Sequence, residues 1–67
     1  MARLGDQLKE LRHERNLKQS ALAKMLSVDQ RTISNWETGI REPDFEMLVK
    51  IAKLFDVTTD YLLGVED

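Results

Sequence analysis

The sequence predicts an all-α fold in which five short helices pack into one compact domain. Apolar residues recur at helical spacing in five segments, and residues that cap or stop helices lie between those segments. No segment alternates apolar and polar residues with a period of two, so no strand is expected. The chain has 67 residues, the length of one small domain, and we expect residues 1–67 to form a single unit.

The first predicted helix spans residues 3–15 and has leucines at helical spacing along one face. Asn16 tolerates the left-handed conformation that commonly ends a helix. The second helix spans residues 19–26, and Ser27 and Val28 form the turn that follows it. The residues of these two helices that we expect in the core are Leu4, Leu8, Leu11, Leu22 and Leu26.

The third predicted helix spans residues 30–38, with Asp29 as its N-cap and Gly39 at its end. Ile33 and Trp36 fall on one side of this helix and should face the core. At about 100° per residue, polar side chains occupy an arc of roughly 140° on the other side. These polar residues are Gln30, Arg31, Ser34, Asn35 and Thr38.

The last two predicted helices span residues 45–55 and 59–63. Asp44 and Thr58 are their N-caps, and Gly64 closes the second of them. Apolar residues wrap more than half of the circumference of the helix over 45–55, which predicts that it is the central buried helix. Those apolar residues are Phe45, Met47, Leu48, Val49, Ile51, Ala52, Leu54 and Phe55.

Two short helices joined by a tight turn, with a polar face turned outward on the second, form a helix-turn-helix, here about residues 19–38. The second helix of this motif enters the major groove of double-stranded DNA. Arg pairs with guanine, and Gln or Asn with adenine, through two hydrogen bonds. The sequence therefore predicts base contacts from Gln30, Arg31, Ser34 and Asn35.

The chain has a formal net charge of −2, whereas a protein that binds DNA is expected to carry positive charge. The charges are unevenly distributed. Residues 1–42 contain 8 Lys/Arg and 6 Asp/Glu, a balance of +2, whereas residues 43–67 contain 2 Lys and 6 Asp/Glu, a balance of −4. The sign at the docking face matters more for binding than the sum, but the acidity argues against tight non-specific binding.

Several classes of function find no support in the sequence. There is no Cys for a disulfide or a thiolate metal site, no long apolar run and no signal-peptide pattern. We therefore expect a cytoplasmic protein with no membrane partner. There is also no phosphate-binding glycine loop and no nucleophile–base constellation, so we expect no enzyme activity, cofactor, metal or small-molecule ligand.

Five segments carry a resemblance that extends over nearly the whole chain. They are LKELRHERNLKQSALAKML, TISNWETG, REP, LVKIAKLFDV and YLLG. With these segments the chain resembles the Cro/cI-type helix-turn-helix repressors, also called the xenobiotic-response-element family. The resemblance implies a lambda-repressor-like fold of five helices whose second and third helices bind DNA. It also implies a transcriptional repressor that binds palindromic operators as a homodimer.

The resemblance also implies roles for individual residues. Gln19 matches a residue that opens the second helix and contacts the DNA backbone, and Thr38 and Arg41 match positions near phosphates. Arg12 and Glu37 match a structural ion pair between the first and third helices. The residues that match base-facing positions are Gln30, Arg31 and Asn35.

Four positions depart from the pattern of the family. Ser27 and Asp56 stand where Gly is common, and a left-handed conformation there costs about 1–2 kcal/mol without Gly. Lys18 replaces a Thr-type N-cap, which loses a cap but places a cation where phosphates are expected. Asp29 replaces the more usual Ser, and its carboxylate is unfavourable close to a phosphate.

The apolar residues near the C-terminus exceed what one short helix can bury. Tyr61, Leu63 and Val65 can form a dimer contact or simply an apolar terminus, and we expect the dimer contact. A protein-interaction module, such as an antitoxin-like helical domain whose main partner is a protein, is the alternative function. The acidic C-terminal part favours this alternative somewhat, and an enzyme is the weakest of the three interpretations.

Three residues allow a chemical interpretation as well as a structural one. Trp36 can stack on a nucleobase, but its place beside Ile33 predicts a core position. Glu37 can be a catalytic carboxylate, but an ion pair with Arg12 is the preferred interpretation. His13 lies opposite the leucine face of the first helix, with no metal-ligand spacing around it, and is expected to be an ordinary exposed side chain.

Overall fold

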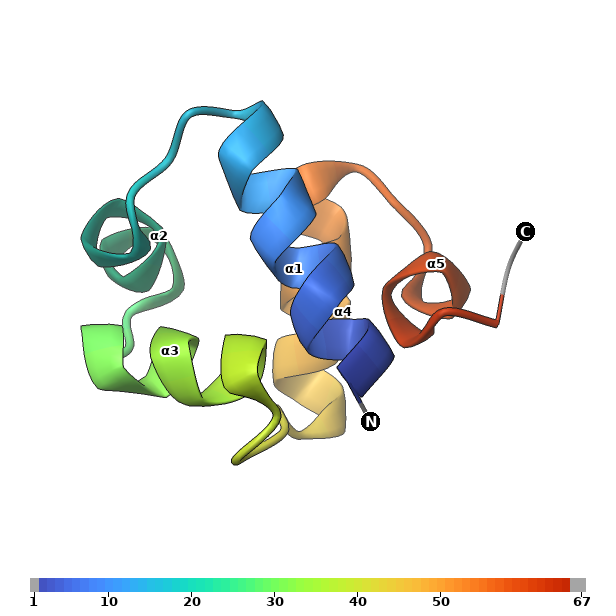
Figure 1. The fold of residues 1–67 in the computed structure, drawn as a ribbon. Helices are drawn as coiled ribbons and strands as arrows, with labels where there is room; N and C mark the ends of the chain where they lie inside the picture. Colours follow the sequence, from blue (N-terminus) through green and yellow to red (C-terminus); the bar gives the residue numbers. More distant parts are fainter. Residues whose placement is uncertain (1, 66–67) are drawn as a thin grey trace.

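Five helices and no strand make up residues 2–65, the part of the chain that the computed structural model describes (Figure 1). The predicted all-α fold is therefore confirmed. The first helix begins and ends one residue earlier than expected, and the bounds of the other four agree with the prediction. The helices are α1 (Ala2–Glu14), α2 (Gln19–Leu26), α3 (Gln30–Thr38), α4 (Phe45–Phe55) and α5 (Thr59–Leu63).

Side-chain caps define where three of the helices begin. Asp29, Asp44 and Thr58 precede α3, α4 and α5, and each accepts a hydrogen bond from a backbone N–H of the first turn, at 2.8, 2.8 and 3.0 Å. Such caps satisfy N–H groups that have no partner within the helix. Lys18 precedes α2 and makes no side-chain cap, as its chemistry predicts.

Left-handed residues define where the helices end. Asn16, Ser27 and Asp56 have φ values of 54°, 59° and 57°, and Gly39 and Gly64 have φ values of 83° and 76°. The conformation at Ser27 and Asp56 is therefore the one that a glycine would adopt, although both residues carry a Cβ. The turn between α2 and α3 keeps its usual shape at a cost of about 1–2 kcal/mol.

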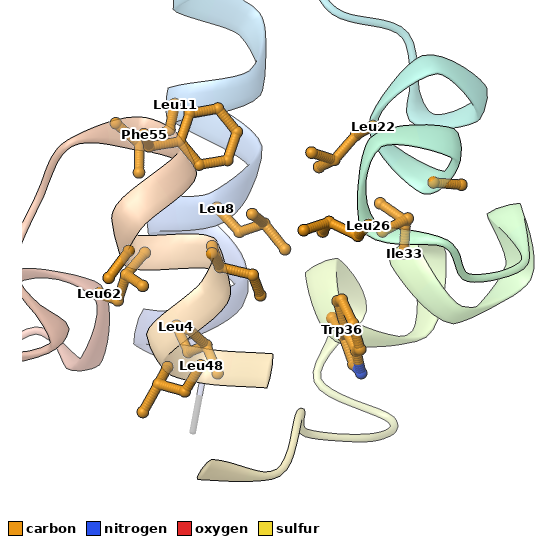
Figure 2. Close-up of a cluster of buried hydrophobic side chains, with 13 residues drawn as sticks. Leu4, Leu8, Leu11, Leu22, Leu26, Ile33, Trp36, Leu48, Phe55 and Leu62 are labelled. Carbon is orange, nitrogen blue, oxygen red and sulfur yellow. The ribbon is translucent and has the colours of Figure 1, made fainter. Parts of the chain in front are cut away.

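In the view of Figure 1, α1 lies in front of α4, with α2 and α3 on one side and α5 on the other. It packs against α3 and α5, while α2 packs against α3 and α4 against α5. Side chains from all five helices meet in one cluster (Figure 2). The cluster consists of Leu4, Leu8, Leu11, Leu22, Ala23, Leu26, Ile33, Trp36, Leu48, Ile51, Ala52, Phe55 and Leu62.

The prediction that α4 is the central buried helix is wrong. Phe45 and Val49 are 86% and 44% exposed, so α4 buries one face rather than most of its circumference. Two further apolar residues of α4, Met47 and Leu54, are only partly buried against the core. Hydrophobic periodicity shows which residues favour burial, but it does not show how many neighbouring helices are present to cover them.

A close contact between backbones joins α1 to the end of α3. Gly5 is buried, and a Cβ added to it would lie 2.4 Å from the carbonyl oxygen of Glu37 and 2.7 Å from that of Trp36. Real Cβ atoms do not approach backbone oxygens so closely. Only glycine therefore allows α1 to reach α3 at this point. No helix within residues 2–65 is long and apolar enough to cross a membrane.

Candidate nucleic-acid interface

The turn between α2 and α3 holds these two helices as a helix-turn-helix. Ser27 ends α2 in the left-handed conformation, and the backbone N–H of Val28 donates to the carbonyl oxygen of Ala23 at 2.9 Å. Val28 is partly buried against the core, so the turn itself is anchored. On α3, Ile33 and Trp36 are buried, and this directs the opposite side of the helix outward.

The outward side of α3 carries the four residues predicted to contact bases. Gln30 and Arg31 are exposed, and Ser34 and Asn35 are half-buried. A shallow hollow in the surface brings three of them together with the first residue of α2. Its lining residues are Gln19, Asp29, Gln30, Arg31 and Ser34. The hollow therefore combines amide, guanidinium, hydroxyl and carboxylate groups, which can pair with the donors and acceptors on base edges.

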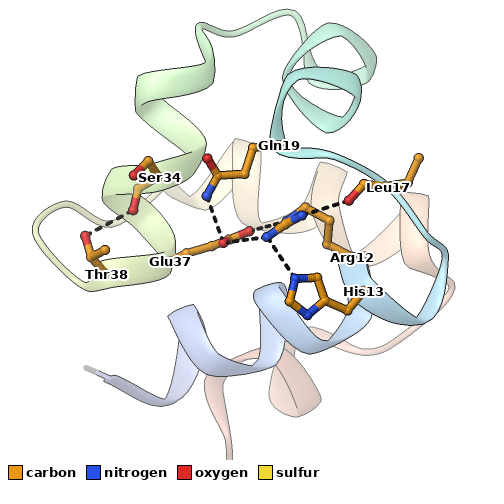
Figure 3. A network of polar contacts seen from close by, with 7 residues as sticks. All are labelled: Arg12, His13, Leu17, Gln19, Ser34, Glu37 and Thr38. Carbon is orange, nitrogen blue, oxygen red and sulfur yellow. Dashed lines mark hydrogen bonds and ion pairs between the residues drawn. The ribbon is translucent and has the colours of Figure 1, made fainter.

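The ion pair expected between Arg12 and Glu37 is present and buried (Figure 3). The Arg12 Nε donates to Glu37 Oε2 at 2.7 Å and its Nη2 to Oε1 at 3.1 Å, and the side chains are 9% and 4% exposed. The Arg12 Nη1 also donates to the carbonyl oxygen of Leu17 at 2.8 Å. The pair links α1 directly to the last turn of α3, so it helps to fix the orientation of that helix.

Gln19 takes part in the same network, which the sequence did not predict. Its Nε2 donates to Glu37 Oε1 at 3.1 Å, so the first residue of α2 is bonded to α3 (Figure 3). A side-chain amide has two N–H donors. One of them is used by Glu37, and the other remains available for a phosphate. Whether this bond forms depends on the distance between α2 and α3, and the spacing of residues along the chain does not predict that distance.

The residues predicted to contact phosphates lie at the two ends of the helix-turn-helix. Lys18 is exposed and Gln19 half-buried at the start of α2, and Thr38 and Arg41 are exposed at and beyond the end of α3. The hydroxyl of Thr38 donates to backbone carbonyl oxygens of α3, at 3.0 and 3.3 Å. Because a hydroxyl has one hydrogen, Thr38 must release these oxygens before it can donate to a phosphate.

His13 lies beside the ion pair rather than at a site of its own. Its exposed ring places Nε2 3.3 Å from Arg12 Nη2. Within residues 2–65, no group of three or more His, Asp or Glu side chains lies where it could hold a metal ion. Trp36 is buried beside Ile33 in the core, so its ring is not available to stack on a nucleobase.

Comparison with known proteins identifies relatives along nearly the whole chain. The regulator ImmR of Bacillus subtilis is 39% identical over 64 residues, which are 96% of this chain and 50% of ImmR. The transcriptional activator BcrR of Enterococcus faecalis is 44% identical over 63 residues, 94% of this chain and 31% of BcrR. Repressor protein C2 of Salmonella phage P22 is 35% identical over 60 residues, 90% of this chain and 28% of C2.

The chain thus spans half or less of the length of these three relatives, which are named as a transcriptional regulator, a transcriptional activator and a repressor protein. A family profile described as Helix-turn-helix matches residues 8–62, which include α2, the turn and α3. The chain therefore belongs to the Cro/cI-type helix-turn-helix family of DNA-binding transcriptional regulators.

Proposed function

We propose that this protein binds specific sequences in double-stranded DNA and represses transcription as a homodimer on a palindromic operator. The observation that carries the proposal is the outward polar side of α3. Ile33 and Trp36 hold the helix in the core, and the side chains on its opposite side remain exposed or half-buried. In this proposal residues 1–67 act as one DNA-binding domain.

The mechanism divides the contacts into two groups with different effects. Base-edge contacts from Gln30, Arg31, Ser34 and Asn35 select the sequence, since the major groove presents a different pattern for each base pair. Phosphate contacts position the domain but do not identify the sequence. The residues proposed for these phosphate contacts are Lys18, Gln19, Thr38 and Arg41.

Repression is proposed as the direction of regulation. The relatives include a protein named as a repressor and one named as an activator. A bound domain that covers a promoter prevents its use without any further surface, whereas activation needs a contact with another protein. Repression is therefore the simpler consequence of DNA binding by this chain.

The proposed dimer contact lies at and after α5. Leu63 is 39% exposed and Val65 is 69% exposed, so both have apolar surface that a second copy can cover. Tyr61 is partly buried against the core, and its backbone carbonyl accepts a hydrogen bond from Gln7 Nε2 at 3.1 Å. In this proposal Leu63 and Val65 provide most of the contact, and Tyr61 provides the exposed remainder of its ring.

A protein-interaction module remains the second candidate function, and an exposed apolar surface favours it. Ile40 and Phe45 are 72% and 86% exposed, in the segment between α3 and α4 and at the start of α4. Exposed apolar side chains can serve to bind a protein. Binding to duplex DNA that weakens as salt increases distinguishes DNA recognition from this alternative.

The test of sequence-specific binding begins with selection of bound duplexes from a random library. Arg31→Ala should then weaken binding to the selected site by about 1–3 kcal/mol and relax the preference at one base pair. Lys9→Ala is the control, because it removes one exposed positive charge from α1 and leaves α3 unchanged. Equal binding of Arg31→Ala and wild type on every duplex would contradict the assignment of α3.

A further inference from the structure

Asp29 places a negative charge at the edge of the surface proposed to meet DNA. It is exposed, it immediately precedes α3, and its Oδ1 accepts a hydrogen bond from the backbone N–H of Arg31 at 2.8 Å. It lines the same hollow as Gln30, Arg31 and Ser34. No other residue that lines this hollow is acidic.

The capping role does not require the charge. Ser and Asn cap helices about as well as Asp does, so a neutral residue would start α3 equally well. The cap uses Oδ1 and holds the side chain in place, whereas a carboxylate has further lone pairs on both oxygens with which to accept hydrogen bonds. Asp29 is therefore an immobilised acceptor, and its charge adds to the cap only the attraction to the positive end of the helix dipole.

The residues at the start of a recognition helix are those that contact base edges. A carboxylate there repels phosphates and the acceptor atoms of guanine and thymine. It accepts a hydrogen bond from the N4 amino group of cytosine, whereas the N6 amino group of adenine, the other donor in the major groove, lies beside the acceptor N7. We propose that Asp29 is a specificity-determining residue that selects a cytosine at one base pair opposite the start of α3. This inference rests on the proposed function, because it assumes that α3 enters the major groove.

The charge also affects binding in a way that does not depend on sequence. Lys18, Arg31 and Arg41 are exposed cations at or near the same surface, and Asp29 opposes their attraction for phosphates. Removing the charge should therefore tighten binding to unselected DNA. The proposal predicts a second effect in addition, namely that the preference for cytosine is lost.

The experiment compares wild type with Asp29→Ser and Asp29→Asn, both of which keep a side-chain cap. Asp44→Asn is the matched control, because Asp44 caps α4 through a hydrogen bond of the same length, 2.8 Å, and lines a different hollow. A library selection first identifies the base pair at which wild type and Asp29→Ser prefer different bases. Dissociation constants are then measured on four duplexes that carry each of the four base pairs at that position and are otherwise identical. Thermal unfolding confirms that each variant is folded.

Wild type should bind the cytosine duplex about tenfold more tightly than the other three, a typical effect of one mismatched base pair. Asp29→Ser should bind all four within about twofold of one another, with a larger gain on the three non-cytosine duplexes than on the cytosine duplex, and Asp44→Asn should keep the wild-type preference. An equal gain for Asp29→Ser on all four, or identical selections for it and wild type, would overturn the inference while leaving the proposed function intact. No salt-dependent duplex binding by wild type would instead overturn the proposed function.

Discussion

Glu37 is a single residue on which three helices depend. Its carboxylate accepts hydrogen bonds from two nitrogens of Arg12 on α1 and from Gln19 on α2, while Glu37 itself belongs to α3. With its side chain 4% exposed, water cannot replace these bonds if they are lost. The position therefore has a stronger effect on stability than an ordinary charged residue of the surface.

Glu37→Gln should lower the free energy of unfolding by about 3–5 kcal/mol, because it leaves the buried charge of Arg12 without its partner. The amide also presents a donor toward groups that are themselves donors. Chemical denaturation measures the loss, and the exposed Glu10→Gln on α1 is the control, expected to change stability by about 0.5 kcal/mol or less. An unchanged midpoint for Glu37→Gln would show that the pair contributes little.

The sequence predicted part of this residue network. The resemblance implied the pairing of Arg12 with Glu37, and the structure contains it. The bond from Gln19 to Glu37 and the proximity of His13 to Arg12 were not predicted. Both depend on how closely side chains of different helices approach, and one sequence provides no information about that distance.

At the scale of the helices, the caps were predictable because they are local. Asp29, Asp44 and Thr58 each bond to an N–H within three residues, so the pattern along the chain is sufficient to identify them. The shape of the turn at Ser27 does not follow from the local pattern, since the left-handed conformation is costly for a residue that carries a Cβ. The structure shows the left-handed conformation, with φ at 59°.

The contact of α1 with α3 could not be predicted, although it depends on one residue. Gly5 lies within a helix, where alanine would normally be more favourable by about 1 kcal/mol. The added Cβ would instead lie 2.4 Å from the carbonyl oxygen of Glu37. Because both sides of this contact are backbone, neither can move aside without displacing its helix.

Gly5→Ala should therefore destabilise the fold by about 1–3 kcal/mol, the usual cost of overpacking, despite the better helix propensity of alanine. Thermal unfolding measures the change, and Lys9→Ala at an exposed position of the same helix is the control, expected to stay within about 0.5 kcal/mol of wild type. A more stable Gly5→Ala variant would mean that α1 and α3 separate at little cost.

At the scale of the whole molecule, the sequence identified the core better than the surface. Every leucine assigned to the core in the first two helices is buried. In each helix these leucines share one face, and that face packs against the other helices. Phe45 and Val49 show the limit, because an apolar residue is buried only where another element covers it. Which apolar residues remain uncovered is a property of the assembled bundle.

Assembly of two copies is the prediction at this scale. A weak dimer through Leu63 and Val65 should form at rising concentration and become stronger on a palindromic duplex, where two copies lie about 34–36 Å apart. Leu63→Asp should weaken both the dimer in solution and the dimer on the duplex. The substitution places a charge against apolar surface whose burial contributes about 25 cal/mol per Å². Sedimentation, alone and with the duplex, measures the stoichiometry.

Leu11→Asp cannot serve as the control, because Leu11 is buried and its loss would unfold the domain. Val49→Asp is suitable, since Val49 is an apolar residue of α4 that is 44% exposed, against 39% for Leu63, and the change adds the same single negative charge outside α5. A one-to-one complex on the palindrome, with Leu63→Asp binding as tightly as wild type, would exclude this dimer.

The two sides of α3 have a consequence for how such a domain can change over time. Ile33, Trp36 and Glu37 secure the helix, whereas Gln30 and Arg31 make no side-chain bond described within residues 2–65. Replacing an exposed residue typically changes stability by about 0.5 kcal/mol or less, whereas truncating a core residue costs several. If the exposed side of α3 reads the bases as proposed, a descendant of this protein can acquire a new DNA target in single mutational steps, each of which leaves a folded protein for selection to act on.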